Sequence, residues 1–269
     1  MKYLSFCLIV ISSIILLSCS SKREIKTDVS IGSGGEPKKE KGTVKEEVTI
    51  NTADSISLAS DYYYENEEKE KSQPAVVLIH QFKSTKEQWD RSFIDLLTSD
   101  GYKVLAYDIR GHGESSKINY DLPTLLTDPN KAPNDLVAVF KWLKSQKGID
   151  STRIAVVGTS IGGNLACYAR YFLGAKTIVG ISNGREGFEK FIGIDDRMMG
   201  RIFPRITSVL FICGSKDGNN AEGEKHIMDM YIDDPKEQKL FESDKHGKFL
   251  IEEHPEIYTQ AISWLQKYL

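Results

Sequence analysis

Residues 154–163, IAVVGTSIGG, decide the fold of this chain. A β-branched and Ala-rich apolar run ends in a Gly-x-Ser-x-Gly centred on Ser160, and residues 164–173 continue with the apolar spacing of a helix. A serine hydroxyl is a weak nucleophile, so enzymes expose it on a tight turn between a strand and a helix, where a base and helix N–H groups reach it. Gly158 and Gly162 leave room for such a turn. The bare pattern also arises by chance, and it is the flanking strand and helix that indicate Ser160 as a nucleophile.

Strand patterns and helix patterns alternate around this stretch, which predicts a mostly parallel sheet with helices on both faces. The expected strands are an antiparallel pair at 44–50 and 56–64, followed by 75–80, 102–107, 154–157, 177–182, 209–214 and 239–241. The expected helices are 84–99, 134–146, 164–173 and 257–268. The first of these helices begins in the capping box Ser84-x-x-Glu87 and carries Trp89, Phe93, Leu96 and Leu97 on one apolar stripe. A length of 269 residues suits one sizeable α/β domain, which we expect over residues 44–269.

The amino terminus has the composition of a signal peptide. Residues 1–18 carry Lys2 as their only charge, with an apolar core at 8–17 that is too short to span a bilayer. The ending Leu-Leu-Ser-Cys at Cys19 resembles the lipobox of bacterial lipoproteins, although its second Leu is bulkier than the usual residue. The resemblance implies that Cys19 becomes a lipidated first residue, and an ordinary secretory signal is the alternative. Both interpretations predict an exported domain, and lipidation of Cys19 would place it at the cell envelope.

Residues 19–43 mix charge with Gly, Ser and Pro and have little apolar content, which predicts a flexible tether. The formal net charge of −3 gives no electrostatic reason to expect a nucleic-acid partner. Cys167 and Cys213 fall within the expected domain, and we favour two buried free thiols over a disulfide. The spacing of Cys and His predicts no metal site.

A second motif follows the expected strand 102–107. Residues 108–115 read DIRGHGES, similar to the Asp-x-Arg-Gly-x-Gly-x-Ser loop that follows the fourth strand of α/β-hydrolases. With the serine turn, this loop makes the chain from residue 44 onward resemble that superfamily, nearest its dienelactone-hydrolase-like and serine-aminopeptidase-like exported branch. The resemblance implies an α/β-hydrolase fold with an eight-stranded, mostly parallel sheet and a small cap. It also implies hydrolysis of a small-molecule ester or amide without a cofactor.

The resemblance places a catalytic triad in the order Ser160, acid, histidine. Asp217, in GSKDG after the expected strand 209–214, is the candidate acid, although Asp before Gly is also ordinary turn chemistry. His246, in SDKHG before the closing helix, is the candidate base.

The other histidines have less favourable positions. His254 is the second candidate but lies against a proline at the start of the last helix. His226 lies mid-helix between charged residues, so we expect it to be solvated. His112 is expected to secure the loop 108–115, and His80 to make structural hydrogen bonds at the end of a buried strand.

An oxyanion hole needs two N–H donors near the developing negative charge. We expect one from the backbone of Ile161 and the other from the backbone of Phe82, within residues 80–84, HQFKS. Here the sequence departs from the usual His-Gly of the superfamily, because Gln81 replaces the glycine. A main-chain donor survives that change, while the Gln81 side chain narrows the pocket or adds an amide contact.

These residues predict two-step acyl transfer, in which His246 accepts the Ser160 proton and water resolves an acyl-enzyme. Only about 25 residues separate the strand at 177–182 from that at 209–214, which predicts a small helical flap. Its Phe188, Phe191, Ile192, Met198, Met199 and Phe203 either line an acyl pocket or pack on the sheet. We therefore expect a carboxylesterase attached to the envelope membrane through Cys19. The alternatives are an exported serine peptidase or amidase and a non-catalytic binding lipoprotein.

Overall fold

The computed structural model describes residues 42–118, 120–128, 130–193 and 204–269. The chain divides into two compact units, Met1–Lys39 and Glu40–Leu269, and all the described residues belong to the second. The predicted signal peptide, the tether up to residue 41 and Cys19 lie outside the described residues, as do Met198, Met199 and Phe203 of the predicted flap. No helix within the described ranges is long and apolar enough to cross a membrane.

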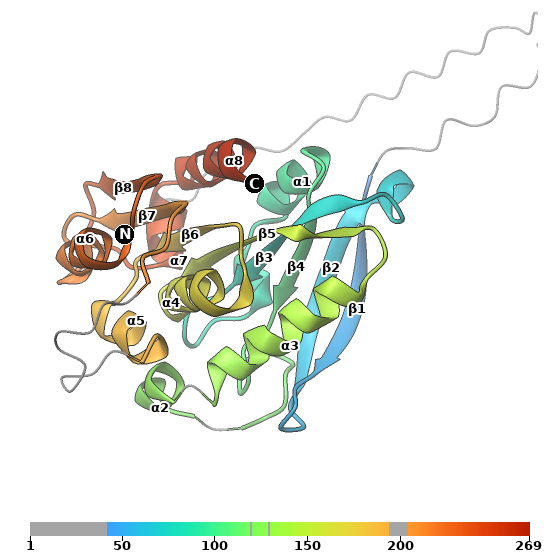
Figure 1. The fold of residues 1–269 in the computed structure, drawn as a ribbon, viewed down its shortest axis with the longest axis horizontal. Helices are drawn as coiled ribbons and strands as arrows, with labels where there is room; N and C mark the ends of the chain where they lie inside the picture. Colours follow the sequence, from blue (N-terminus) through green and yellow to red (C-terminus); the bar gives the residue numbers. More distant parts are fainter. Residues whose placement is uncertain (1–41, 119, 129, 194–203) are drawn as a thin grey trace, which may run out of the picture. The chain divides into compact units, whose positions relative to one another are not determined.

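One eight-stranded sheet forms the centre of the second unit, in the order β1-β2-β4-β3-β5-β6-β7-β8 (Figure 1). Its strands are β1 (Thr43–Asn51), β2 (Ser57–Glu65), β3 (Gln73–Ile79), β4 (Lys103–Tyr107), β5 (Ile149–Thr159), β6 (Thr177–Ile181), β7 (Val209–Gly214) and β8 (Lys236–Phe241). Strand β2 pairs antiparallel with both β1 and β4, and all other neighbours are parallel. The predicted mostly parallel, eight-stranded sheet is confirmed.

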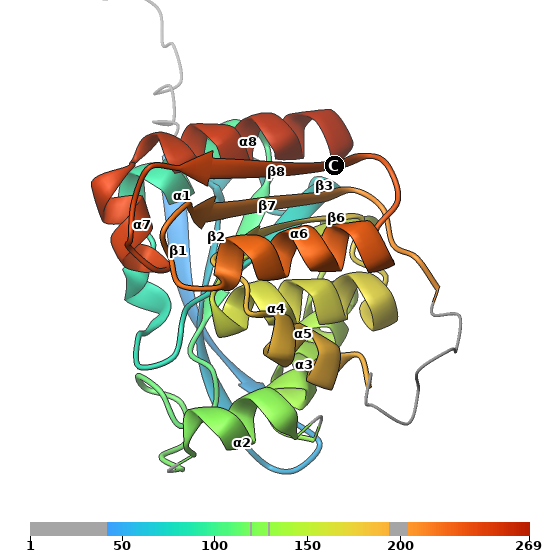
Figure 2. The same cartoon turned by 90° about the vertical axis from the view of Figure 1, so that its left-hand side faces the viewer.

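Helices cover both faces of this sheet, as Figure 2 shows. They are α1 (Arg91–Ser99), α2 (Leu122–Thr127), α3 (Ala132–Ser145), α4 (Ile161–Tyr168), α5 (Arg185–Phe191), α6 (Asn220–Tyr231), α7 (Lys248–Glu253) and α8 (Glu256–Tyr268). Residues of α3, α4 and α6 share one apolar core with the sheet, and residues of α1 and α8 share the core on the other face. The middle strands are continuous apolar runs because both of their faces are buried.

The predicted helix over residues 84–99 is wrong in its first half. Residues Lys86–Gln88 form a single 3-10 turn, and α1 begins only at Arg91. The Lys86 N–H donates to Asp108 Oδ1 at 2.7 Å, so tertiary contacts with the loop after β4 replace the predicted capping box. Leu96, which we expected on the apolar stripe, is exposed.

The flap region contains α5 as far as the structure describes it. Phe188 and Phe191 of α5 are buried in the core shared with α3 and α4, so they pack on the body of the domain. Strand β5 begins at Ile149, five residues before the predicted start at residue 154. Cys167 and Cys213 are buried and free, as predicted.

Candidate active site

Ser160 occupies a sharp turn between β5 and α4. Its φ of 53° and ψ of −115° lie in a region that non-glycine residues rarely adopt, at a cost of roughly 1–3 kcal/mol. The backbone is too close at both glycines for a side chain, since a Cβ at Gly158 would lie 2.2 Å from the carbonyl carbon of Gly162. A Cβ at Gly162 would lie 2.3 Å from the carbonyl oxygen of Ile79. The turn therefore has the strained geometry of a nucleophile elbow, and Ser160 is half-buried at its tip.

Asp217 and His246 come together after neighbouring strands. Asp217 follows β7, and His246 lies in the loop between β8 and α7. The His246 Nδ1 atom lies 2.8 Å from Asp217 Oδ2 and 3.1 Å from Oδ1. The carboxyl group is 9% exposed and the imidazole 38% exposed. An acceptor at Nδ1 fixes the tautomer that leaves Nε2 free to accept a proton.

The electrostatics of the Asp217 carboxyl group favour its ionised form. Burial by itself raises the pKa of Asp217, but the hydrogen bond and electrostatic interaction with His246, together with the other hydrogen bonds to the carboxyl group, lower it by more. Hydrogen bonds from Ser182 and Asn220 act in the same direction. The pKa of Asp217 consequently lies below its usual value, which suits a group that stabilises an imidazolium without taking its proton.

Two further side chains, which were not predicted from the sequence, lie beside this pair. Asn220, at the start of α6, places Nδ2 3.1 Å from Asp217 Oδ1 and 3.3 Å from His246 Nδ1. Because Nδ1 donates to Asp217, the Asn220 amide donates to the carboxylate. The Ser182 hydroxyl accepts a hydrogen bond from Gly247 N at 2.9 Å. The only signal for Asn220 was its place three residues after Asp217, which also fits an ordinary turn.

The loop of His246 lies against the serine turn. A Cβ at Gly247 would lie 3.7 Å from Thr159 Cβ, so the residue after His246 packs against the residue before Ser160. Strands β5, β6, β7 and β8 run parallel, and their carboxyl ends share one edge of the sheet. Ligands of open α/β sheets bind at this edge, so the three predicted triad residues lie where chemistry is expected.

The two predicted oxyanion donors lie beside the same edge. Ile161 begins α4, where N–H groups have no acceptor within the helix. Phe82 lies in a tight turn closed by a hydrogen bond from Ser84 N to Gln81 O at 3.1 Å, and its ring packs edge-on against His112 at 5.3 Å. Both donor roles stay predictions.

His80 holds the Phe82 loop in place, which confirms its predicted structural role. Its Nε2 accepts a hydrogen bond from Ile109 N at 2.9 Å, and its Nδ1 lies 2.7 Å from the carbonyl oxygen of Gln81. Burial lowers the pKa of His80 to about 3, so the ring is neutral. It therefore connects the loop after β3 to the loop after β4.

The loop over residues 108–115 uses its charged residues internally. Asp108 accepts hydrogen bonds from Lys86 N and Glu114 N at 2.7 and 2.8 Å. The fully buried Arg110 pairs with Asp135 and with Asp54, each at 2.7 Å. These contacts make the loop a rigid support for the Phe82 turn.

The other histidines lie in contacts of their own. His254 Nδ1 lies 3.1 Å from a Glu256 oxygen at the start of α8. His226 is partly exposed on α6 and lies 3.8 Å from Glu189. These contacts connect neither ring to Asp217.

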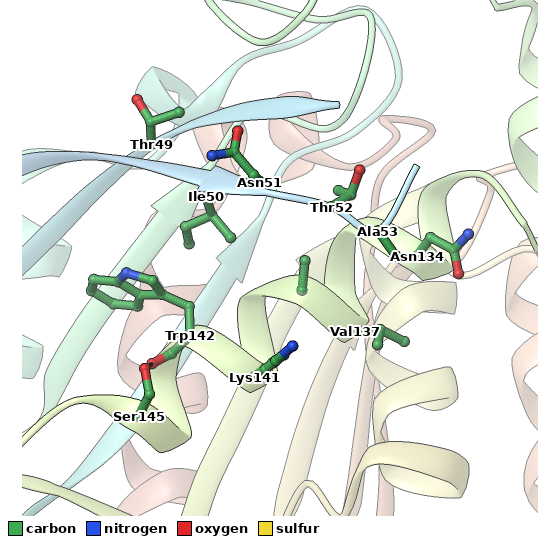
Figure 3. Close-up of a pocket in the computed structure, with 11 residues that line it drawn as sticks. Thr49, Ile50, Asn51, Thr52, Ala53, Asn134, Val137, Lys141, Trp142 and Ser145 are labelled. Carbon is green, nitrogen blue, oxygen red and sulfur yellow. Dashed lines mark hydrogen bonds between the residues drawn. The ribbon is translucent and has the colours of Figure 1, made fainter. Parts of the chain in front are cut away.

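Two cavities differ in their relation to this constellation. A cavity of about 510 Å³ adjoins the predicted oxyanion loop and is lined by Phe82, Lys83 and His112 among others. A second cavity, of about 630 Å³, lies between β1 and α3, where Ile50 and Trp142 form apolar walls (Figure 3). The predicted triad residues line neither of these two cavities, and we associate only the first with the site because it adjoins the predicted oxyanion loop.

Comparisons with known proteins agree with this architecture. Residues 74–171 match the family model described as the alpha/beta hydrolase fold. The chain is 31% identical over 126 residues to the thiohydrolase aneE of Aspergillus aculeatus, covering 47% of this chain and 37% of that protein.

Two solved structures have the same fold over most of the chain. An esterase of Pyrococcus furiosus matches with a TM-score of 0.62 and 22% identity, covering 88% of this chain and 95% of the esterase. An acetyl xylan esterase from Paenibacillus sp. R4 matches with a TM-score of 0.64 and 18% identity, covering 86% and 90%.

The sequence matches are partial. The chain spans about a third of the length of the first curated relatives that it matches, at 32%, 30% and 37%. The structural matches cover nearly the whole of their own chains, but at identities that show the fold alone. This chain therefore has the α/β-hydrolase fold.

Proposed function

We propose that this chain is a serine hydrolase that cleaves carboxylic esters through an acyl-enzyme. The observation that carries the proposal is the strained Ser160 turn at the same sheet edge as the hydrogen-bonded Asp217 and His246. A non-glycine residue held at positive φ points to function when the surrounding packing enforces it, as the two glycines do here.

In the proposed mechanism, His246 Nε2 accepts the Ser160 hydroxyl proton while Oγ attacks the substrate carbonyl carbon. The N–H groups of Ile161 and Phe82 stabilise the oxyanion, and each such donor is worth about 3 kcal/mol of barrier. The protonated His246 then donates to the leaving alkoxide. Water, activated by the same imidazole, cleaves the acyl-enzyme and releases the carboxylic acid. Asp217 keeps the imidazole in the required tautomer throughout.

Ester chemistry is favoured by the proteins that share this fold. Two of them are named as esterases, and the partial sequence relative is named as a thiohydrolase. We carry the ester class over as a proposal, because a fold supports several chemistries.

Substrate turnover tests this proposal. The full chain is assayed with p-nitrophenyl esters of short and medium length, the matching thioesters and p-nitroanilides, each beside Ser160→Ala. We expect ester hydrolysis that falls on the order of 10⁶-fold in kcat in Ser160→Ala, with unchanged circular dichroism. Faster hydrolysis of the anilides would indicate a peptidase or amidase. No turnover by a folded parent would favour a binding lipoprotein.

We also propose that Cys19 carries a lipid that anchors the domain to the envelope membrane. The lipobox-like ending and the tether-like composition of residues 19–43 support this proposal. Metabolic labelling with palmitate and membrane fractionation test it, with Cys19→Ser as the control. Equal labelling of both chains would contradict it.

A further inference from the structure

Gln81 makes the amide contact that the sequence analysis left open. Gln81 is buried, with 8% of the residue exposed, and its Oε1 accepts a hydrogen bond from Lys248 N at 2.7 Å. These two residues are 167 positions apart in sequence. Lys248 is two residues after His246, so this bond attaches the loop that carries the proposed base to the loop that carries the proposed oxyanion donor Phe82.

Gln88 connects Gln81 to the segment that carries Ser160. Its Oε1 accepts a hydrogen bond from Gln81 N at 3.1 Å, and its Nε2 donates to Thr159 Oγ1 at 2.9 Å. Thr159 is fully buried and directly precedes Ser160. The chain Thr159–Gln88–Gln81–Lys248 therefore connects the nucleophile, the oxyanion loop and the base.

Gly247, the residue after His246, packs directly against this contact. A Cβ at Gly247 would lie 2.0 Å from Gln81 Oε1, so a side chain there would displace the Gln81 amide from its place. Gly247 has φ of 57°, and its N–H is held by the Ser182 hydroxyl at 2.9 Å. His246 is thus followed by two backbone N–H groups, each with a side-chain acceptor from a different strand end.

We propose that Gln81 and Gln88 are positioning residues that set the place of the His246 imidazole relative to Ser160 and the oxyanion donors. This inference rests on the proposed function. The Gln81 amide does not touch the reacting atoms in this account, since it acts through the backbone of Lys248. A shift of about 1 Å in a catalytic group can lower the rate about 100-fold. We therefore expect loss of the hydrogen bond from Lys248 N to Gln81 to lower kcat strongly while the protein stays folded.

The test compares Gln81→Met with the parent in ester turnover. Methionine has the same length and no strong acceptor, so it removes the bond with little change in volume. We expect kcat to fall between about 10-fold and 100-fold with KM unchanged. Gln81→Glu keeps an oxygen acceptor for Lys248 N, and its kcat is expected to lie closer to the parent than to Gln81→Met.

Gln73→Met is the matched control. Gln73 is equally buried, at 8% exposure, and lies at the opposite end of β3, where its amide donates to Glu68. We expect the kcat of Gln73→Met to equal that of the parent. A loss of kcat in this control would measure the general effect of replacing a buried glutamine by methionine.

Gln88→Met provides a second, independent variant. Because both glutamines act along one chain of contacts, the double variant is expected to lose less than the product of the two single losses. If Gln81→Met fails to fold, Gln88→Met tests the positioning role by itself, through a fall in kcat with KM unchanged.

The outcomes separate the two proposals. A parent that neither turns over esters nor reacts with a fluorophosphonate overturns the proposed function. An active parent whose kcat is unchanged in Gln81→Met and Gln88→Met overturns the positioning role alone. A loss in Gln81→Met that Gln81→Glu does not reduce also contradicts it.

Discussion

The Asp217–His246 contact allows a quantitative prediction for Asp217→Asn. The substitution keeps the shape of the side chain and removes its negative charge. Two unit charges 2.8 Å apart, the distance from Asp217 Oδ2 to His246 Nδ1, attract by about 6 kcal/mol at an effective dielectric constant of about 20. His246 is 38% exposed, so water screens part of this attraction and the value is an upper limit. Since about 1.4 kcal/mol corresponds to tenfold, kcat is expected to fall by up to about 10⁴-fold.

The assay is kcat for p-nitrophenyl acetate at neutral pH, with the folded state checked by circular dichroism. Asp244→Asn is the control, because it removes a carboxylate from the loop that carries His246. The Asp244 carboxylate pairs with Lys245 at 2.9 Å. We expect no change in the control. A kcat for Asp217→Asn within tenfold of the parent would refute the assignment of Asp217 as the residue that stabilises the imidazolium.

Two further substitutions follow from the structure. Gly247→Ala places a Cβ 2.0 Å from Gln81 Oε1 at φ of 57°, so both kcat and Tm should fall. Gly174→Ala is the control, because Gly174 has a φ of 79° but no atom lies within 4 Å of where its Cβ would be. We expect only Tm to fall in this control. Equal losses of kcat in Gly247→Ala and Gly174→Ala would contradict the reasoning. Burial raises the pKa of Glu224 to about 8, from 4.5. Between these pH values the folded state holds a proton that the unfolded state has released, so stability should decrease as pH rises. The free energy of unfolding, measured with urea, should not show that decrease in Glu224→Gln. Parallel pH profiles of this free energy for the parent and Glu224→Gln would count against the prediction.

The sheet could be predicted because its strands have strong local signals. The predicted strand 209–214 has the same bounds as β7, and the predicted strand 177–182 is one residue longer than β6. Both strands are continuous apolar runs bounded by polar turns. Ser160, Asp217 and His246 could be singled out because each follows a strand, and parallel strands bring their carboxyl ends to one edge. The contact between Asp217 and His246 was found where this reasoning expected it.

The features that sequence reasoning missed depend on contacts between distant segments. The capping box at Ser84 has the local pattern of a helix start, yet Lys86 and Gln88 are engaged by Asp108 and Thr159, from other strand ends. Gln81 read as a departure from the superfamily, and only the fold brings it to Lys248. No local periodicity encodes such long-range hydrogen bonds, which is why tertiary contacts override helix propensity here.

The most direct test of the account is to trap the acyl-enzyme nucleophile. The full chain is incubated with a fluorophosphonate, and the modified residue is located by peptide mass spectrometry, with Ser160→Ala treated in parallel. We predict one phosphonyl group per chain, on Ser160, and no modification of the variant. A folded parent that is not modified, or is modified at another residue, would contradict the assignment of Ser160 as the nucleophile.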